Sequence, residues 1–536
     1  MPIGNGGVMI ALARVVSGAL AGGLLAASLA VTPASFADSP GVASVESVSV
    51  APAHAGMSTQ QAPIARGDRA DRLARFYSQR AAWSQCADAP DFECATVRVP
   101  RSYQKPRGAT LKIALLRNAA NSGNPNARSI VVNPGGPGAS GTSLVANSLN
   151  TQFPAELVDR FNIVGMDPRG VGRSTQINCV TEAALAKRSA DLPRKAKQQA
   201  AFLVNSKEMA KGCATRGKAL VRVVGTQNAA RDLDFVRSAL GQKKLWYLGV
   251  SYGTYLGATY ASLFPKRVGR TVLDAGLSPT VNMIGWGKAQ TTGFQKALSR
   301  WADSCPEREG CPFPGDRAAV VGELNEMLAM YNEVPLPSPS GRPIGDGTIR
   351  GLIQTALPGG ESSWPLVDAI VSAADDGNTE VLEAIGNAFE NAYGTTPTNL
   401  VSANSAVNCY DRPTSTTLKQ MRKRARVWGA KASTFGASIA WSITSTCTYW
   451  PVRKGQVPPE VKSTTKQRIQ MIGGTKDPLT PYKWTVELSK RIKNSRVLKF
   501  TGDGHGGLGK GSPCVDDAVT NYFVTGKVTP KGASCS

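Results

Sequence analysis

The stretch from Leu245 to Gly257, LWYLGVSYGTYLG, constrains the fold of this chain more than any other segment. It has the pattern of an apolar strand, a turn with one serine, and a helix of small residues. The turn reads G-x-S-x-G, and Gly249 and Gly253 leave room for a sharp bend on either side of Ser251. Such a turn places the hydroxyl at a helix N-terminus, where the helix dipole favours developing negative charge. Ser251 is therefore the candidate nucleophile.

A glycine- and proline-rich loop lies upstream of this turn. Residues 129–133 have the pattern of a buried strand, and PGGPGASG follows at 134–141. Backbone N–H groups without side chains suit an oxyanion hole, which combines one loop N–H with the N–H of the residue after the nucleophile. Tyr252 supplies the second of these donors. Gly136 is the candidate for the first, with Gly135 as the alternative.

The scarcity of histidine selects the catalytic base. A serine hydroxyl needs an adjacent base to act as a nucleophile, and the chain has only two histidines. His54 lies in a segment with little pattern, whereas His505 lies in a glycine-rich loop just past a predicted strand at 496–500. We expect His505 to be the base. A histidine-based metal site is excluded by the same scarcity, and the chemistry requires no metal or organic cofactor.

Three aspartates are candidates for the acid that orients this histidine. Asp477 follows a predicted strand at 468–474, and gives the chain order Ser251, Asp477, His505. Asp274 ends the strand after the serine turn, and Asp503 lies two residues before the histidine. We favour Asp477 and keep the other two as alternatives.

The order of the predicted elements indicates the fold class. Strands and helices alternate between residues 129 and 274, which predicts an α/β fold with a mostly parallel, doubly wound sheet. Helical patterns then dominate to about residue 450, and the sheet resumes near residue 468. The expected parts are a signal peptide (1–37), a flexible leader or propeptide (38–70), the first part of the core (71–276), an inserted helical cap lobe (277–450) and the C-terminal part of the core (451–536).

Two details of the first core part are also predicted. A helix is expected over 226–240, with Thr226 as its N-cap. Asp167 and Arg169 follow a predicted strand at 161–166, and we expect them to pair with each other and to hold the loop beside the site.

The N-terminus and the cysteines both indicate export. An apolar segment from Val15 to Val31 precedes ASFA at 34–37, a small-residue cleavage site. No later stretch is long and apolar enough to span a membrane, so no integral membrane segment is expected after processing. The ten cysteines form no C-x-x-C motif, and pairing sequential neighbours is the simplest arrangement for an exported protein. The proposed pairs are Cys86–Cys94, Cys179–Cys213, Cys305–Cys311, Cys409–Cys447 and Cys514–Cys535.

The net charge is +24, and the basic residues are scattered along the chain. No basic run is interleaved with aromatic residues, and no zinc or RNA-binding signature is present, which argues against a nucleic-acid partner. A charge of this size favours solubility or adsorption to anionic cell-surface polymers.

As a set, these stretches resemble a known family, the secreted tripeptidyl aminopeptidases, which are related to prolyl iminopeptidases within the α/β-hydrolases. The resembling segments are 133–141, 167–174, 247–274, 447–451, 473–481 and 504–506. The resemblance implies an α/β-hydrolase fold, the triad Ser251, Asp477 and His505, and release of short peptides, often tripeptides, from free N-termini outside the cell.

The resemblance leaves alternatives open. Prolyl iminopeptidases begin the oxyanion loop with histidine, whereas this chain has Pro134, and relatives include carboxylesterases. A secreted carboxylesterase or lipase with the same triad is therefore the alternative function, and a non-catalytic surface-binding protein is a third. An exopeptidase also needs an anion for the α-ammonium of its substrate. Asp411, which lies in a C-x-D pattern similar to that of the family, and Glu361 are the candidates.

Overall fold

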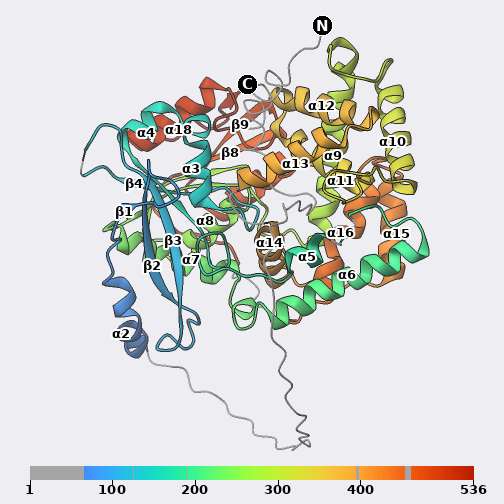
Figure 1. The fold of residues 1–536 in the computed structure, drawn as a ribbon. Helices are drawn as coiled ribbons and strands as arrows, with labels where there is room; N and C mark the ends of the chain where they lie inside the picture. Colours follow the sequence, from blue (N-terminus) through green and yellow to red (C-terminus); the bar gives the residue numbers. More distant parts are fainter. Residues whose placement is uncertain (1–65, 125, 187, 189, 394–396, 453–459) are drawn as a thin grey trace, which may run out of the picture.

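The computed structural model describes residues 66–124, 126–186, 188, 190–393, 397–452 and 460–536. The predicted signal peptide, His54 and most of the predicted leader lie outside the described residues. Figure 1 shows a lobe built on a β-sheet beside a lobe built of helices. The sheet lobe is formed by the chain on both sides of the helical lobe in sequence.

The sheet has ten strands among the described residues, in the order β1-β2-β3-β5-β4-β6-β7-β8-β9-β10. Their bounds are β1 Ser84–Gln85, β2 Glu93–Pro100, β3 Thr110–Asn118, β4 Ser129–Asn133, β5 Asn162–Met166, β6 Leu245–Val250, β7 Val268–Asp274, β8 Ile469–Lys476, β9 Ser495–Asp503 and β10 Ser534–Cys535. Strands β5, β4 and β6 to β10 are parallel to one another, whereas the pairs β1–β2, β2–β3 and β3–β5 are antiparallel. This is a doubly wound α/β-hydrolase sheet with an antiparallel edge.

Helices cover both faces of the sheet, because successive strand residues point to opposite sides. Ile130 and Val132 of β4 pack into one core, and Val131 packs into the other. Helices α2 (Arg66–Tyr77), α7 (Thr226–Ala239), α8 (Tyr252–Leu263) and α17 (Tyr482–Arg491) contribute to the core around Val131. Helices α3 (Gly141–Gln152), α4 (Ala155–Arg160) and α18 (Pro513–Thr525) contribute to the opposite core. A 3-10 turn at Leu220–Arg222 precedes α7.

The helical lobe has a hydrophobic core of its own, in which Trp301, Leu324, Ile353 and Phe435 are buried. Its elements are α9 Met283–Ser304, α10 Arg317–Glu333, α11 Asp346–Ala356, α12 Trp364–Asp375, α13 Thr379–Tyr393, α14 Pro397–Asp411, α15 Leu418–Gly429 and α16 Gly436–Thr448, with 3-10 turns at Cys305–Glu307, Leu357–Gly359 and Glu361–Ser363. The lobe buries apolar surface independently of the sheet, which is what a chain too long for one core requires.

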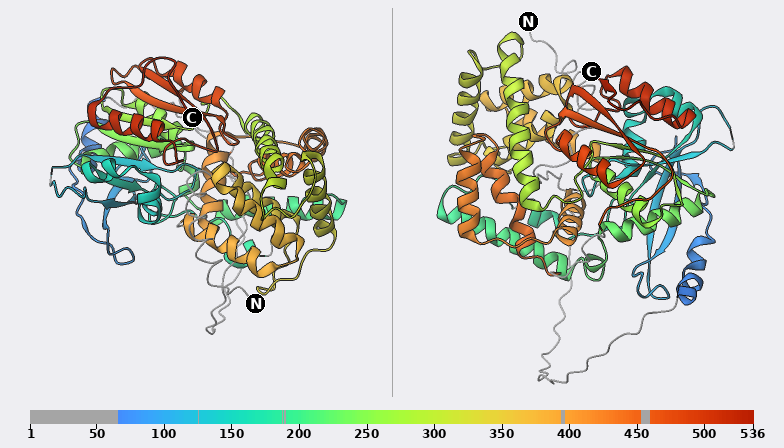
Figure 2. Two further views of the ribbon diagram at one scale, coloured as in Figure 1. Left: turned by 90° about the horizontal axis from the view of Figure 1, so that it is seen from above. Right: turned by 180° about the vertical axis from the view of Figure 1, so that it is seen from behind.

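A segment from the first part of the core also packs against the helical lobe. Helices α5 (Glu182–Ala186) and α6 (Ala196–Thr215) extend away from the sheet and lie against the helical lobe (Figures 1 and 2). The rings of Phe202 on α6 and Trp441 on α16 pack edge to face with centroids 5.7 Å apart. Arg422 on α15 donates to Gln199 at 2.8 Å. The wall of the cap is thus formed by two separate stretches of sequence.

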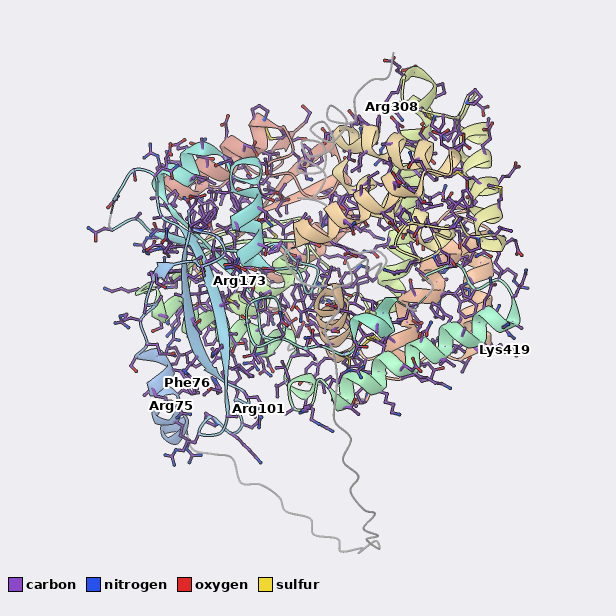
Figure 3. The ribbon with its side chains drawn as sticks, in the orientation of Figure 1. Arg75, Phe76, Arg101, Arg173, Arg308 and Lys419 are labelled. Atoms are coloured by element: carbon purple, nitrogen blue, oxygen red, sulfur yellow. A yellow bond between two sulfur atoms is a disulfide. The ribbon has the colours of Figure 1, made fainter. Side chains whose placement is uncertain are left out.

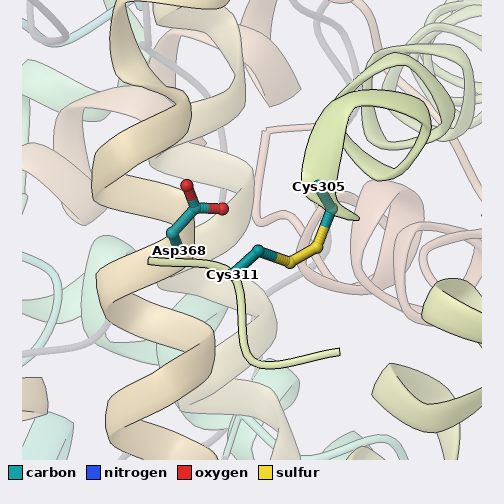
Figure 4. Close-up of side chains that lie close together, drawn as sticks. All are labelled: Cys305, Cys311 and Asp368. Carbon is teal, nitrogen blue, oxygen red and sulfur yellow. A yellow bond between two sulfur atoms is a disulfide. The ribbon is translucent and has the colours of Figure 1, made fainter. Parts of the chain in front are cut away.

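Five disulfides join the sequential cysteine pairs 86–94, 179–213, 305–311, 409–447 and 514–535. The Cys305–Cys311 disulfide lies near Asp368 (Figure 4). The Asp368 carboxylate accepts hydrogen bonds from Trp301 Nε1 and from the guanidinium of Arg308, both at 2.7 Å. Because the two sulfurs are bonded to each other and the carboxylate is occupied, this group is structural.

Two predictions about the outside of the molecule can be placed on the structure. Basic side chains occur on both lobes, such as Arg75 and Arg101 on the sheet lobe and Arg308 and Lys419 on the helical lobe (Figure 3). In the described part of the chain, no helix is both long and apolar enough to cross a membrane.

Candidate active site

Ser251 lies at the sharp turn between β6 and α8. Its backbone has φ 58° and ψ −123°, a conformation that non-glycine residues rarely adopt and that costs about 1–3 kcal/mol. A Cβ on Gly249 would lie 2.4 Å from the carbonyl oxygen of Gly253, and a Cβ on Gly253 would lie 2.6 Å from that of Asn133. The two glycines flanking the serine are therefore required by close backbone contacts.

The glycine-rich loop lies beside this turn because β4 and β6 are parallel neighbours that end at the same edge. A Cβ on Gly135 would lie only 2.6 Å from the Val250 carbonyl oxygen, and the Gly135 N–H already donates to Asn133 Oδ1 at 3.2 Å. Gly136 has φ 101° and lines the adjoining cavity. Tyr252 is the first residue of α8, where helical N–H groups have no intrahelical partner.

Asp477 and His505 form a buried pair at the same edge of the sheet. His505 Nδ1 lies 2.8 Å and 3.0 Å from the two carboxylate oxygens of Asp477. This carboxylate also accepts from the backbone N–H groups of Leu479 and Thr480 and from the Thr480 hydroxyl, each at 2.8 Å. Nδ1 is thus directed at the acid, and Nε2 has no hydrogen-bond partner among the described residues.

The two alternative acids have other partners. The Asp274 carboxylate accepts the N–H groups of Gly507 and Leu508 at 2.9 Å, just past the histidine, and its backbone oxygen accepts the Ser251 N–H at 2.9 Å. Burial raises the pKa of Asp274, and these two N–H bonds oppose that shift. Asp503 instead forms an ion pair with Arg300 of α9. Asp274 thus holds the backbone beside both Ser251 and His505, and Asp503 links the two lobes.

A buried cation lies near these carboxylates. The ammonium of Lys510 is inaccessible to solvent and has no hydrogen-bond partner among the described residues. Burial lowers the pKa of Lys510 to about 8, and the charges of Asp274 and Asp477 oppose this shift. A positive charge in the loop after His505 therefore compensates part of the negative charge buried at this edge.

Asp167 and Arg169 do not pair with each other, so that prediction is wrong. Arg169 forms a fully buried ion pair with Asp232 of α7 at 2.6 Å. Asp167 accepts hydrogen bonds from Ser140 and Thr142 and from the Arg173 N–H, which join its loop to the start of α3. The residues that these side chains contact lie too far away in sequence for a local pattern to reveal them.

A cavity of about 370 Å³ lies between the oxyanion loop and the helical lobe. Gly136 and Pro137 line it from the sheet lobe, and α6, α9, α11, α13, α14 and α16 line it from the helical side. Most of its lining is apolar. Among the described residues, four charged ones line it as well, namely Arg188, Asp191, Arg350 and Glu390.

Neither Asp411 nor Glu361 is among the described residues that line this cavity. Asp411 is buried at the end of α14, and it accepts from the N–H of Thr226 at 3.2 Å and from its hydroxyl at 2.5 Å. The Thr226 hydroxyl also lies 2.5 Å from the Tyr252 hydroxyl. Through Thr226, Asp411 therefore connects the helical lobe to α8, the helix that follows the serine turn. Thr226 is not the predicted N-cap, since Gly225 occupies that position. Glu361 is exposed, 4.0 Å from Lys476 Nζ.

Comparison with known proteins bears on this geometry. Residues 430–535 match the family model described as TAP-like protein. A tripeptidyl aminopeptidase of Streptomyces lividans is 32% identical over 88% of this chain and 90% of its own length. Serine protease Hip1 of Mycobacterium tuberculosis is 31% identical over 88% of this chain and 93% of its own length.

This chain belongs to the tripeptidyl aminopeptidase family. It is an α/β-hydrolase and a hydrolytic enzyme, as the sequence predicted. Its relatives also include carboxylesterase B of M. tuberculosis, which is 30% identical over 85% of this chain and 89% of its own length.

Sequence reasoning missed three features of this family member. Thr480 donates to Asp477 from three residues away, and the Asp-Pro-Leu-Thr sequence of a local side-chain turn is a signal that could have identified it. The double role of Asp274 needs the pairing of β7 with its neighbours, which the sequence does not specify. The cavity acids Asp191 and Glu390 lie about 200 residues apart, on the α5–α6 connection and on α13, and only the tertiary packing places both at one cavity.

Proposed function

We propose that this enzyme is a secreted serine exopeptidase that releases short peptides, chiefly tripeptides, from free N-termini through an acyl-enzyme on Ser251. The observation that carries the proposal is the buried His505–Asp477 pair at the same sheet edge as the strained Ser251 turn, beside a cavity enclosed by a helical lobe. The names of the peptidase relatives support peptides as the substrates.

The proposed chemistry uses only residues of this chain. His505 Nε2 removes the Ser251 proton as Oγ attacks the scissile carbonyl carbon, and Asp477 stabilises the imidazolium. The N–H groups of Gly136 and Tyr252 bind the oxyanion. The imidazolium then protonates the leaving amine as the C–N bond breaks. Water, deprotonated by the same histidine, attacks the acyl-enzyme, and the peptide leaves with Ser251 restored.

A cavity with acids in its lining supports action at a free N-terminus. Three extended residues span roughly 10 Å, the length of peptide that we propose precedes the scissile bond in this cavity. The acids that line the cavity are Asp191 and Glu390, and we propose them as the anchor for the α-ammonium. They replace Asp411 and Glu361, because neither of those two acids is among the described residues that line the cavity.

Secretion and adsorption to anionic surfaces belong to the same proposal. Five disulfides are typical of proteins that fold in an oxidising compartment. Helix α15 contains five basic residues and no acidic residue, and exposes Lys419, Arg422, Lys423 and Arg426. This face fits an anionic polymer, and adsorption there would weaken as salt rises.

A carboxylesterase is the second candidate function. The carboxylesterase B relative and the mostly apolar cavity, which includes Phe202, Phe294 and Trp441, favour it. The same Ser251 acyl-enzyme would form from an ester, with an alcohol as the leaving group.

A panel of substrates separates these functions. The purified enzyme is assayed with tripeptidyl anilides whose N-terminus is either free or acetylated, and with p-nitrophenyl esters of short acids. The proposal predicts hydrolysis of the free tripeptidyl anilides at least about 100-fold faster than the acetylated ones, the discrimination expected when a buried charge loses its partner. Hydrolysis of esters alone, or of blocked peptides equally well, would assign the enzyme to the esterases or to the endopeptidases.

A further inference from the structure

Two buried amide side chains line the cavity with a polar atom that has no partner. Asn408 of α14 and Gln290 of α9 are each 4% exposed, and both line the cavity beside the oxyanion loop. Asn408 Oδ1 and Gln290 Nε2 have no hydrogen-bond partner among the described residues. Buried polar groups are nearly always paired in folded proteins, so two unpaired atoms on residues that line a cavity point to a ligand that pairs with them.

The orientation of Asn408 follows from a chain of hydrogen bonds that starts at the oxyanion loop. The carbonyl oxygen of Pro137 can only accept, and Asn404 Nδ2 donates to it at 2.9 Å. This leaves Asn404 Oδ1 as an acceptor, and Asn408 Nδ2 donates to it at 3.1 Å. The oxygen of the Asn408 amide is therefore the atom left for another molecule, and it needs a donor.

Helix α14 is fixed against the oxyanion loop by direct backbone packing. A Cβ on Gly138 would lie 3.0 Å from the N atom of Asn404 and 3.2 Å from the carbonyl oxygen of Leu400. The helix lies between the two lobes in Figure 1. Asn404 and Asn408 of α14 are thus held at a fixed position relative to Gly136, where the scissile carbonyl is expected to bind. A polar group on this helix is positioned relative to the reaction centre.

The two unpaired atoms match the main chain of a peptide. One is an acceptor, which suits a backbone N–H, and the other is a donor, which suits a backbone carbonyl. We propose that Asn408 Oδ1 and Gln290 Nε2 form a subsite that binds the main chain of the substrate residues preceding the scissile bond. This inference rests on the proposed peptidase function. The subsite is uncharged, so it binds the peptide backbone, and recognition of the α-ammonium is left to Asp191 and Glu390.

A backbone subsite has a consequence for specificity. It selects for an extended peptide with an N–H at one defined position and is indifferent to the side chains. A substrate that lacks that N–H should therefore be processed poorly whatever its sequence. Short esters, which do not reach the subsite, should be processed normally.

Substrate and enzyme are changed together in the test. Wild-type enzyme, Asn408→Leu and Gln290→Leu are assayed with a tripeptidyl anilide, with its analogues N-methylated at each internal amide, and with p-nitrophenyl acetate. Ser445→Ala is the matched control, because Ser445 is also buried in the cavity lining but its hydroxyl already donates to the Ser442 carbonyl at 3.1 Å.

We expect the Asn408 and Gln290 variants to lower kcat/KM for the tripeptidyl anilide about 10- to 100-fold. We expect less than a threefold loss with p-nitrophenyl acetate, which also shows that the variants are folded. One N-methyl position should lower the wild-type rate about as much, and should cause little further loss in Asn408→Leu. Ser445→Ala should behave as wild type throughout.

Other results would overturn the inference. Equal losses of peptide and ester hydrolysis would show a structural role for the amides. Full additivity between N-methylation and Asn408→Leu would show that the amide does not bind that N–H. A wild-type enzyme that cleaves free tripeptidyl anilides while both variants match it would remove the subsite and leave the peptidase intact. A wild-type enzyme that cleaves none of the peptides would overturn both proposals.

Discussion

The carboxylates at the sheet edge that carries Ser251 and two amides on the helical wall of the cavity differ in how fully their polar atoms are hydrogen-bonded. At the sheet edge, the Asp477 carboxylate accepts three hydrogen bonds besides the His505 contact, and the Asp274 carboxylate is bound by the loop after the histidine. On the helical wall, Asn408 and Gln290 are equally buried and each has an atom without a partner.

This difference indicates a division of work. The hydrogen bonds of Asp477 and Asp274 hold His505 and its loop in one geometry before any substrate arrives, which is what transition-state stabilisation requires, and they leave His505 Nε2 available for the Ser251 proton. A cavity wall with unpaired atoms is completed by a ligand, which is what selection requires. We therefore assign chemistry to the sheet edge and recognition to the helical lobe. Substitutions in the two regions should separate kcat from substrate preference.

The largest effect is expected at the nucleophile. Ser251→Ala should lower kcat for both anilides and esters by about a millionfold, to background, because no acyl-enzyme can form. The unfolding temperature should stay close to that of the wild type, as the methyl group fits where the hydroxymethyl lay. Kinetics and thermal unfolding of the same preparation check this. Residual hydrolysis above background would mean that another residue supplies the nucleophile.

The next effect distinguishes two of the three aspartates at the sheet edge, Asp477 and Asp503. Asp477→Asn should lower kcat about a thousandfold to ten-thousandfold with little change in KM, because the histidine loses the acceptor that fixes its tautomer. Asp503→Asn is the control, since Asp503 pairs with Arg300 and not with His505. It should cost less than about tenfold. If the two losses were exchanged, the assignment of the acid would be wrong.

A smaller effect is expected in the helical lobe. Glu390→Gln and Asp191→Asn should each raise KM for free tripeptidyl anilides about tenfold, and should reduce the preference over acetylated substrates, because each removes one negative charge from the cavity. Asparagine at 191 can still accept the Gly347 N–H, which Asp191 binds at 2.9 Å. Steady-state kinetics with both substrate types measure the change. An unchanged preference in both variants would remove these acids from the anchor.

The smallest effect concerns stability between the lobes. Burial raises the pKa of Asp411 from 3.8 to about 6, so its carboxyl binds a proton more tightly in the folded than in the unfolded protein. Its contribution to stability is therefore complete below pH 4 and is lost as the pH rises through 6. Relative to wild type, Asp411→Asn should gain about 2–3 kcal/mol in free energy of unfolding between pH 4 and pH 7. Denaturant titrations at several pH values test this, and parallel curves for the two proteins would contradict it.

The same division explains what could be predicted from the sequence. The serine turn, the glycine-rich loop at 134–141, the order of the strands that lead to Asp274 and Asp477, and the loop of His505 all rest on local patterns of strand, glycine and turn. These patterns specify backbone geometry within about ten residues. The parallel α/β sheet and its helical insertion follow from the succession of such patterns.

The helical wall of the cavity could not be predicted in this way. Gln290, Asn408 and Glu390 lie on three different helices, and their common orientation depends on how the helices pack. Asp411 shows the same limit, because its C-x-D pattern suggested a substrate ligand, while its contact with Thr226 required the docking of α14 on α7. The segment from Cys179 to Cys213 was expected to belong to the first part of the core. Its helix α6 instead forms part of the cavity wall.

One measurement tests the central claim that the sheet edge performs the chemistry and the helical lobe selects a free N-terminus. The enzyme is treated with a tripeptidyl diphenyl phosphonate, with its N-terminus free or acetylated, and the rate of inactivation and the modified residue are determined. We predict a single adduct on Ser251. Inactivation should be at least about 50-fold faster with the free amine, because the acetylated reagent cannot form the buried charge pair with the cavity acids. An adduct on another residue, or equal rates for the two reagents, would contradict the account.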